Sequence, residues 1–246
     1  MKIKFLGTAH GVPLKDRFCS STMLEFENCY YLVDAGAPAV DLILRDGKDI
    51  NDLRAVFTTH AHLDHTVGLI HLTNLMSWYY IESSADFYLT NDMQKASYES
   101  VISAGGQRNF VYPERLRFHV TDPEAPYEDE NIKLDYFKNG HMNNSYSILV
   151  TDKTTGKRVL FSGDFSGMLA LSDVPKILSE QEIDVFVCEM AHFGVKELEP
   201  YLDTCKAKSV YFTHVFPLDK YDGIEALKDK YAFEIHSPSD GDIIEF

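Results

Sequence analysis

The chain has 246 residues, and 45% of them are hydrophobic, which is enough for a substantial buried core. Its 38 acidic and 23 basic residues give a formal net charge of −15, which disfavours broad attraction to nucleic acid or anionic membranes. No apolar stretch of the sequence approaches the roughly 20 residues of a membrane span, and the four cysteines lack C-x-x-C spacing. We therefore expect one cytoplasmic domain, residues 1–246, with no membrane partner.

The first half of the chain shows mainly strand patterns, opening as a meander of three strands. The expected strands are residues 2–7, 22–26, 30–34, 52–59, 86–89, 115–120 and 132–137. Apolar residues at helical spacing predict helices over 38–45, from the segment after His65 to about 76, and over 92–103.

The second half begins with a hairpin, residues 145–151 and 158–161, around Thr154-Thr155-Gly156. Helices and strands then alternate. We expect helices near 174–179, 196–205 and 224–231, and strands at 185–188, 210–213, 233–236 and 243–246. No linker, repeat or low-complexity tract divides the chain, so the pattern favours a single layered α/β domain.

Four potential metal ligands follow one predicted strand in the pattern H-x-H-x-D-H: His60, His62, Asp64 and His65. In an extended segment His60 and His62 point the same way and can reach one ion, whereas Asp64 and His65, past the bend, can face a second. A single histidine before a helix is usually a surface or packing residue. Four ligand-type side chains within six residues instead indicate a site for borderline divalent metals.

Isolated aspartates and histidines end several other predicted strands. They are Asp34, His141, Asp164 and His214. Each alone is typical of a turn or cap residue. Two ions nevertheless need more ligands than the H-x-H-x-D-H segment contains, and these residues can supply them.

Asp34, the H-x-H-x-D-H segment, His141, Ser162-Gly163-Asp164 and Thr213-His214 together resemble the five motifs of the metallo-β-lactamase-fold superfamily of hydrolases. The resemblance spans essentially the whole chain and implies an α/β (α+β) fold, a four-layer αββα sandwich. It further implies a ligand set for two ions and an orienting carboxylate, Asp34. The implied ligands are His60, His62 and His141 for one ion, Asp64, His65 and His214 for the other, and Asp164 bridging both.

The opening Phe5-Leu6-Gly7-Thr8, with Pro13 and Arg17, resembles the ribonuclease Z-like branch of phosphodiesterases within that superfamily. That branch carries a His-Glu dyad whose histidine gives a proton to the leaving oxygen. Here Cys188 precedes Glu189, and the nearest histidine is His192. His192 is either a displaced proton donor or an ordinary loop histidine. No segment resembles the tRNA-gripping arm of that branch.

The expected function is a metal-dependent hydrolase with a bridging hydroxide between two divalent ions, zinc first, with manganese or iron as alternatives. Asp64 would orient the hydroxide and His192 would protonate the leaving group. The favoured reaction is hydrolysis of a small or cyclic phosphodiester. Hydrolysis of a lactone, thioester or β-lactam, and a non-hydrolytic di-iron redox or sensing role, remain alternatives. The expected partner is a small molecule rather than nucleic acid, and a homodimer is compatible with the sequence.

Overall fold

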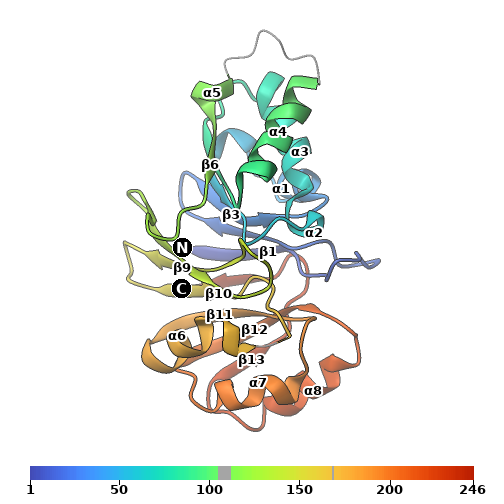
Figure 1. Cartoon of the computed structure of the whole chain (residues 1–246), viewed down its shortest axis with the longest axis vertical. Helices are drawn as coiled ribbons and strands as arrows, with labels where there is room; N and C mark the ends of the chain where they lie inside the picture. The colour runs from blue at the N-terminus through green and yellow to red at the C-terminus, as the bar shows by residue number, and fades with distance from the viewer. Residues whose placement is uncertain (105–111, 168) are drawn as a thin grey trace. The chain divides into compact units, whose positions relative to one another are not determined.

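The computed structural model describes residues 1–104, 112–167 and 169–246, and it divides the chain into two compact units. Unit 1 comprises Met1–Thr121 and Ser239–Phe246, and unit 2 comprises Asp122–Pro238. Each unit contains one seven-stranded sheet and its own helices (Figure 1). Unit 1 therefore takes residues from both ends of the chain.

Unit 1 has the strand order β14-β1-β2-β3-β4-β5-β6. Its strands are β1 (Lys2–Gly7), β2 (Ser21–Glu25), β3 (Tyr30–Ala35), β4 (Leu53–Phe57), β5 (Ala85–Leu89), β6 (Leu116–Val120) and β14 (Ile243–Glu245). Its helices are α1 (Ala39–Arg45), a 3-10 turn (Ile50–Asp52), α2 (Leu63–Thr66), α3 (Gly68–Trp78), α4 (Asp92–Ala104) and α5 (Tyr112–Arg115). Pairing is antiparallel from β14 to β3 and parallel from β3 to β6, which confirms the predicted opening meander.

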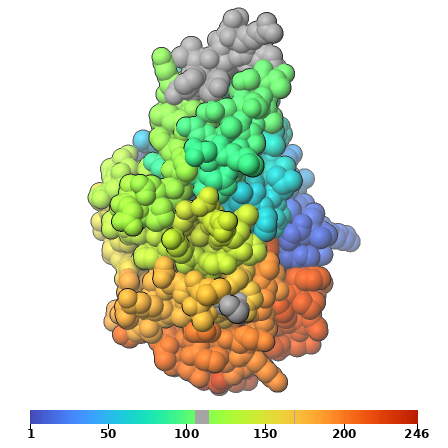
Figure 2. All heavy atoms as spheres, viewed as in Figure 1, coloured from blue at the N-terminus to red at the C-terminus, as the bar shows by residue number. Residues whose placement is uncertain are grey.

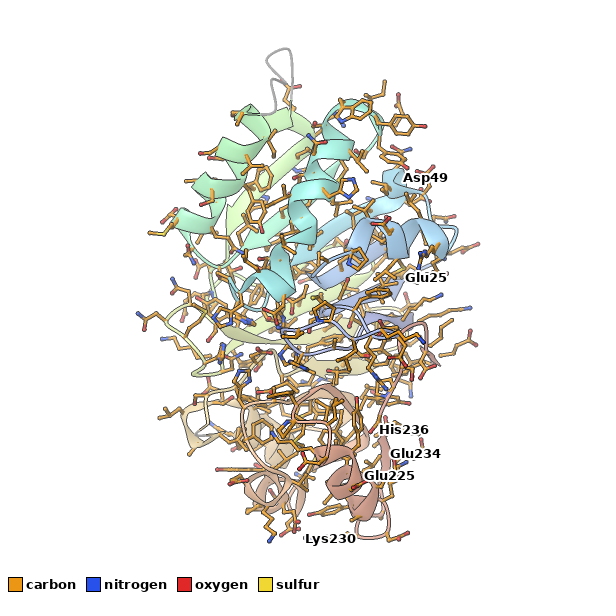
Figure 3. The ribbon with its side chains drawn as sticks, turned by 90° about the vertical axis from the view of Figure 1, so that its right-hand side faces the viewer. Glu25, Asp49, Glu225, Lys230, Glu234 and His236 are labelled. Atoms are coloured by element: carbon orange, nitrogen blue, oxygen red, sulfur yellow. The ribbon has the colours of Figure 1, made fainter. Side chains whose placement is uncertain are left out.

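Helices α1, α3 and α4 cover one face of the unit 1 sheet (Figure 3). Alternate strand residues such as Leu32, Val56 and Phe87 are fully buried beneath them, at about 1.5–3 kcal/mol of transfer free energy each. Helix α4, green in Figure 2, buries residues at i, i+4 and i+8 and keeps its other face at the surface. Its Tyr98 hydroxyl donates to the carbonyl of Thr66, 2.7 Å away, and so ties α4 to α2.

Unit 2 has the strand order β13-β12-β11-β10-β9-β8-β7. Its strands are β7 (Tyr127–Glu128), β8 (Ile132–Lys138), β9 (Tyr146–Asp152), β10 (Arg158–Phe161), β11 (Ile183–Met190), β12 (Ala207–Val215) and β13 (Glu234–His236). Its helices are a 3-10 turn (Leu169–Leu171), α6 (Val174–Glu180), α7 (Val195–Leu202) and α8 (Lys220–Leu227). Residues of α6, α7 and α8 pack with those of β10, β11 and β12 in one hydrophobic core.

The direction of the unit 2 strands decides where their loops meet. Strands β10 to β13 run parallel, and β8 has the same direction because β9 is antiparallel to both β8 and β10. The carboxyl ends of β8, β10, β11 and β12 therefore lie at one edge of the sheet. Loops at such an edge are where functional side chains gather in α/β proteins.

Two β-bulges place non-glycine residues in the left-handed region, Asp34 with φ 58° and His214 with φ 54°. Each is the extra residue where a strand passes its partner: Asp34 lies in β3 opposite β2, and His214 lies in β12 opposite β11. This conformation costs a residue with a Cβ roughly 1–3 kcal/mol. Bulges re-aim side chains. Both strained residues were picked out from the sequence as site candidates.

Most predicted elements lie within one to three residues of their observed positions. The last predicted helix is wrong in position: it was expected over 224–231, but α8 begins at Lys220 and ends at Leu227. Gly223 is a poor helix former, yet it lies inside α8. Its lack of a side chain lets the helix pack closely against Val195, because an added Cβ would lie 3.0 Å from that side chain. None of the described helices is long and apolar enough to cross a membrane.

Candidate metal-binding site

In unit 1, the H-x-H-x-D-H segment leaves the carboxyl end of β4, beside the end of its parallel neighbour β3. The rings of His60 and His62 converge, with Nε2 of His60 lying 3.0 Å from Nδ1 of His62. Ligand atoms of Asp64 and His65 also lie within 4.8 Å of each other. The two pairs expected from the sequence pattern are therefore present in this unit.

Asp34 binds both ends of this segment, at Thr59 and at His65. Its carboxylate accepts hydrogen bonds from the amide of Thr59 at 2.7 Å, the hydroxyl of Thr59 at 2.8 Å and Nδ1 of His65 at 2.7 Å. Because Nδ1 of His65 donates to Asp34, its Nε2 is the nitrogen on the Asp64 side, 3.4 Å from a carboxylate oxygen. Carboxylate-oriented imidazoles of this kind are typical of metal ligands.

Thr59 extends the same arrangement to His60. Its hydroxyl hydrogen goes to Asp34, so its oxygen accepts from Nδ1 of His60, 3.0 Å away. With the hydrogens assigned in this way, Nε2 of His60 is the nitrogen that can accept a metal ion. Thr59 escaped the sequence analysis, although its position between the strand and the first histidine was the available signal.

Gly36 allows the turn after Asp34 to pack against the ligand segment. A Cβ at this position would lie 2.1 Å from the backbone oxygen of Asp64 and 2.6 Å from Cβ of Cys19. No side chain can be accommodated there without moving the backbone. The Asp-Ala-Gly sequence at the end of β3 is therefore required by close approach as well as by the turn.

In unit 2, Asp164 lies between two histidines at the edge formed by β8, β10 and β12. One of its oxygens is 3.4 Å from Nε2 of His214, and its nearest ligand atom is within 4.8 Å of His141. Nδ1 of His141 donates to the carbonyl of Phe165 at 2.8 Å, which directs Nε2 of that ring away from the backbone. The Phe165 carbonyl could not be found from sequence, because every residue carries a backbone oxygen.

His192 pairs with Glu189 in the loop after β11. Its Nδ1 donates to Oε1 of Glu189 at 2.9 Å, and its backbone amide donates to Oε2 at 3.2 Å. The same carboxylate accepts from the amides of Phe165 and Ala191. His192 Nδ1 is also 3.9 Å from Asp164. The structure therefore brings His192, Glu189 and Asp164 together, an arrangement that suits a proton donor beside a metal ligand.

The four cysteines are free thiols. Burial raises the pKa of the Cys188 thiol well above its ordinary value, with the Glu189 charge acting in the same direction. Burial likewise raises the pKa of Cys19, which lies near Asp64. Neutral thiols are poor nucleophiles and poor ligands, so the donor set of the candidate site consists of imidazole and carboxylate.

The loop after β1 is tied down by Asp240. This carboxylate accepts from the amide and hydroxyl of Thr8 and from the amide of Phe18, and Arg17 donates to the Thr8 hydroxyl. Burial raises the pKa of Asp240 despite these hydrogen bonds. His10 lies in the same loop, and burial lowers its pKa, with the Asp64 charge opposing. The Gly-Thr and Arg17 features of the sequence thus have a structural role in unit 1.

A ribonuclease Z of Cyanothece sp. is 31% identical over 155 residues, which cover 62% of this chain and 47% of that protein. The chain spans about half the length of the curated relatives it matches. YhfI of Bacillus subtilis, a metallo-beta-lactamase fold protein, has a TM-score of 0.79 at 18% identity, over 100% of this chain and 99% of that one. The short form of human tRNase Z has a TM-score of 0.75 at 21% identity, over 100% and 99%.

These likenesses confirm the fold class and the ribonuclease Z-like resemblance predicted from the sequence. The expected layers, two sheets and two sets of helices, are present, since each unit contributes one of each. Residues 1–215 match the family model described as Anti-Pycsar protein Apyc1. Because this match covers far more than half of the residues of the chain, the chain belongs to the Anti-Pycsar protein Apyc1 family.

Proposed function

We propose that this protein is a metal-dependent phosphodiesterase that hydrolyses a small or cyclic phosphodiester. The proposed metal ligands are those that the resemblance of the sequence implies. They are His60, His62 and His141 for one ion, Asp64, His65 and His214 for the second, and Asp164 for both.

The residues within each unit fit divalent ions. In unit 1, Nδ1 of His65 donates to Asp34 and Nδ1 of His60 donates to Thr59, so each ring directs its Nε2 to the ligand side. In unit 2, Nδ1 of His141 donates to Phe165. Fixing one ring nitrogen so that the other can bind is the usual support of a histidine ligand. Imidazole and carboxylate suit zinc, manganese and iron alike.

The bound ions would supply a bridging hydroxide as nucleophile and positive charge for the phosphoryl oxygens. Asp64 is proposed to orient the attacking water in addition to serving as a ligand. The other proton in the reaction belongs to the leaving group. An alkoxide is a poor leaving group, and cleavage of an alkyl diester therefore needs a proton donor in the transition state.

The His192–Glu189 pair carries this proposal. With Nδ1 of His192 donating to Glu189, the charge of the imidazolium is stabilised and Nε2 is left to give its proton to the departing oxygen. General acid catalysis of this kind contributes about 10²–10⁴-fold. A thiolate leaves without a proton, so this pair favours alkyl diesters over thioesters as substrates. The contact between His192 and Glu189 supports the donor role over the alternative of an ordinary loop histidine.

The proposed substrate is a small molecule rather than RNA. The formal charge of −15 opposes binding of a long polyanion, whereas a single phosphodiester needs only local neutralisation by the ions. Cleavage of a tRNA precursor at a rate comparable with that of a small diester would contradict this part of the proposal.

A four-substrate panel tests the proposed function. The metal-loaded protein is given a bis-aryl phosphodiester, a cyclic dialkyl phosphodiester, a lactone and a thioester, and hydrolysis of each is followed. We expect cleavage of both diesters, loss of that activity in Asp164→Ala, and its retention in Asp41→Ala, which removes an exposed carboxylate of α1. Turnover of the lactone or thioester alone would replace the proposal by acyl hydrolysis, and no turnover at all by a non-hydrolytic role.

A further inference from the structure

Lys220, the first residue of α8, binds the loop that carries His192. Its Nζ lies 3.0 Å from the carbonyl of Met190, 2.9 Å from that of Ala191 and 2.6 Å from that of Phe193. These carbonyls flank His192 on both sides. An ammonium group has three hydrogens, and these three acceptors can use all of them.

The other side of the loop is held by Glu189. The amides of Ala191 and His192 donate to its Oε2, while the His192 ring donates to Oε1. The loop of residues 190–193 therefore presents two amides to a carboxylate and three carbonyls to an ammonium. Because both groups are charged, these are charge-assisted hydrogen bonds, which are stronger than bonds between neutral groups.

Lys220 also connects this loop to the strand that carries His214. Strands β11 and β12 pair in parallel, β12 ends at Val215, and Phe216 begins the segment that leads to α8. The amide of Phe216 donates to the carbonyl of Met190 at 3.3 Å, the same carbonyl that Lys220 binds. Burial lowers the pKa of the Lys220 ammonium, and the charges of Glu189, Glu197 and Asp219 oppose that effect.

We propose that Lys220 is a positioning residue for the general acid: its ammonium fixes the 190–193 loop so that His192 faces the leaving group. Lys220 itself touches no reacting atom. This inference rests on the proposed function, because it assigns to Lys220 an effect on the proton transfer that His192 performs. It predicts that removing the ammonium has the same kinetic signature as removing the imidazole.

The test uses Lys220→Met, which keeps the length of the side chain and removes its charge. The matched control is Lys228→Met. Lys228 lies just after α8, and its Nζ donates to the exposed carboxylate of Glu225, which Figure 3 labels. Each metal-loaded variant is assayed with a dialkyl diester and with a nitrophenyl diester. Hydrogen exchange of the amides of Ala191 and His192 is measured in parallel.

For Lys220→Met we expect kcat on the dialkyl diester to fall about 10- to 100-fold, within the range of a general acid, while the nitrophenyl rate changes about twofold or less. Exchange of the two amides should accelerate, and Lys220→Met combined with His192→Ala should be no slower than His192→Ala alone. Lys228→Met should resemble the wild type. The retained nitrophenyl rate shows that the variant is folded, and Lys220→Gln, which keeps a neutral donor, should lie between Met and wild type.

Different results would contradict the positioning role of Lys220 and the general-acid role of His192. If His192→Ala slows the dialkyl diester but Lys220→Met does not, or if amide exchange in the loop is unchanged, the positioning role is overturned and the proposed function stands. If Lys220→Met slows both diesters equally, Lys220 is only structural and the inference is also overturned. If His192→Ala has no effect on either diester, His192 is not the general acid. Lys220 then has no positioning role in catalysis either, whatever the exchange measurement gives.

Discussion

Asp34 accepts a hydrogen bond from Nδ1 of His65 at 2.7 Å, from a backbone conformation that residues with side chains rarely adopt. The φ of 58° at Asp34 is what turns its carboxylate back onto Thr59 and His65 at the end of β3. The local cost of roughly 1–3 kcal/mol is offset by three hydrogen bonds to a carboxylate. The strain and the orientation of His65 are thus two aspects of one arrangement.

Replacing Asp34 by Ala should weaken metal binding through His65 although Asp34 is not itself a proposed ligand. Loss of an orienting carboxylate typically costs about 10–100-fold in metal affinity. Metal content after dialysis against a graded chelator series measures the change. Asp41→Ala is the control. Unchanged affinity in Asp34→Ala would show that the hydrogen bond to His65 serves only the fold of unit 1.

Asp164→Ala should remove more metal than any single histidine change. The purified protein is expected to hold about two transition-metal ions, and a carboxylate that touches both affects both. His141→Ala and His214→Ala should each leave about one ion. Elemental analysis together with protein concentration gives the ratio. An equal loss in all three variants would contradict the bridging role, and a wild type with a single ion would contradict the dinuclear site.

Glu189→Gln should unfold at a lower temperature than the wild type. The Glu189 carboxylate accepts from three backbone amides and from Nδ1 of His192 with its two oxygens. A glutamine has one oxygen and an amide group that donates, so at least one buried N–H loses its acceptor at a cost of about 1–3 kcal/mol. For a chain of this size that corresponds to a decrease of several degrees, at about 2–4 °C per kcal/mol. A thermal melt of equal or higher midpoint would contradict the acceptor count.

Features that are local in the chain could be predicted from the sequence. The candidate ligands His60 to His65 lie in one turn, and the apolar run before them predicted the strand β4, which the structure confirms. The sequence pattern also placed Asp34, Asp164 and His214 at strand ends, because a polar residue after an apolar run marks such an end. His192, the proposed proton donor, was visible only as a histidine near Glu189.

What could not be predicted depends on contacts between distant parts of the chain. The Phe165 carbonyl that orients His141 has no residue identity to recognise. Lys220 reaches residues 190–193 through the pairing of β11 with β12, and no spacing in the sequence reports that pairing. The helix that begins with Lys220 was also placed too late. It contains Gly223, a poor helix former, which packs there against Val195, and that contact is between distant parts of the chain.

Acidification should remove a stabilising interaction of Asp86 in unit 1. The Asp86 carboxylate accepts two hydrogen bonds from Arg117, of 2.7 and 2.8 Å, and one from His119, of 2.7 Å. Burial acts to raise the pKa of Asp86, but the hydrogen bonds and charges of Arg117 and His119 outweigh it and hold the pKa below its ordinary value of 3.8. A carboxyl group whose pKa is lower in the folded than in the unfolded state stabilises the fold above the unfolded value, and that contribution is lost as the pH falls through the folded value. Asp86→Asn should therefore melt about 2 °C below the wild type at neutral pH, a small difference because the ion pair is partly exposed to solvent. The difference should begin to shrink as the pH falls below 3.8 and continue to shrink towards the lower pKa of the folded protein, because the wild-type carboxyl group is neutralised there as well. Melting curves of the two proteins between pH 3 and 7 provide the measurement, with Asp41→Asn as the exposed control, and a gap that stays constant across this range would show that the charge of Asp86 contributes nothing to stability.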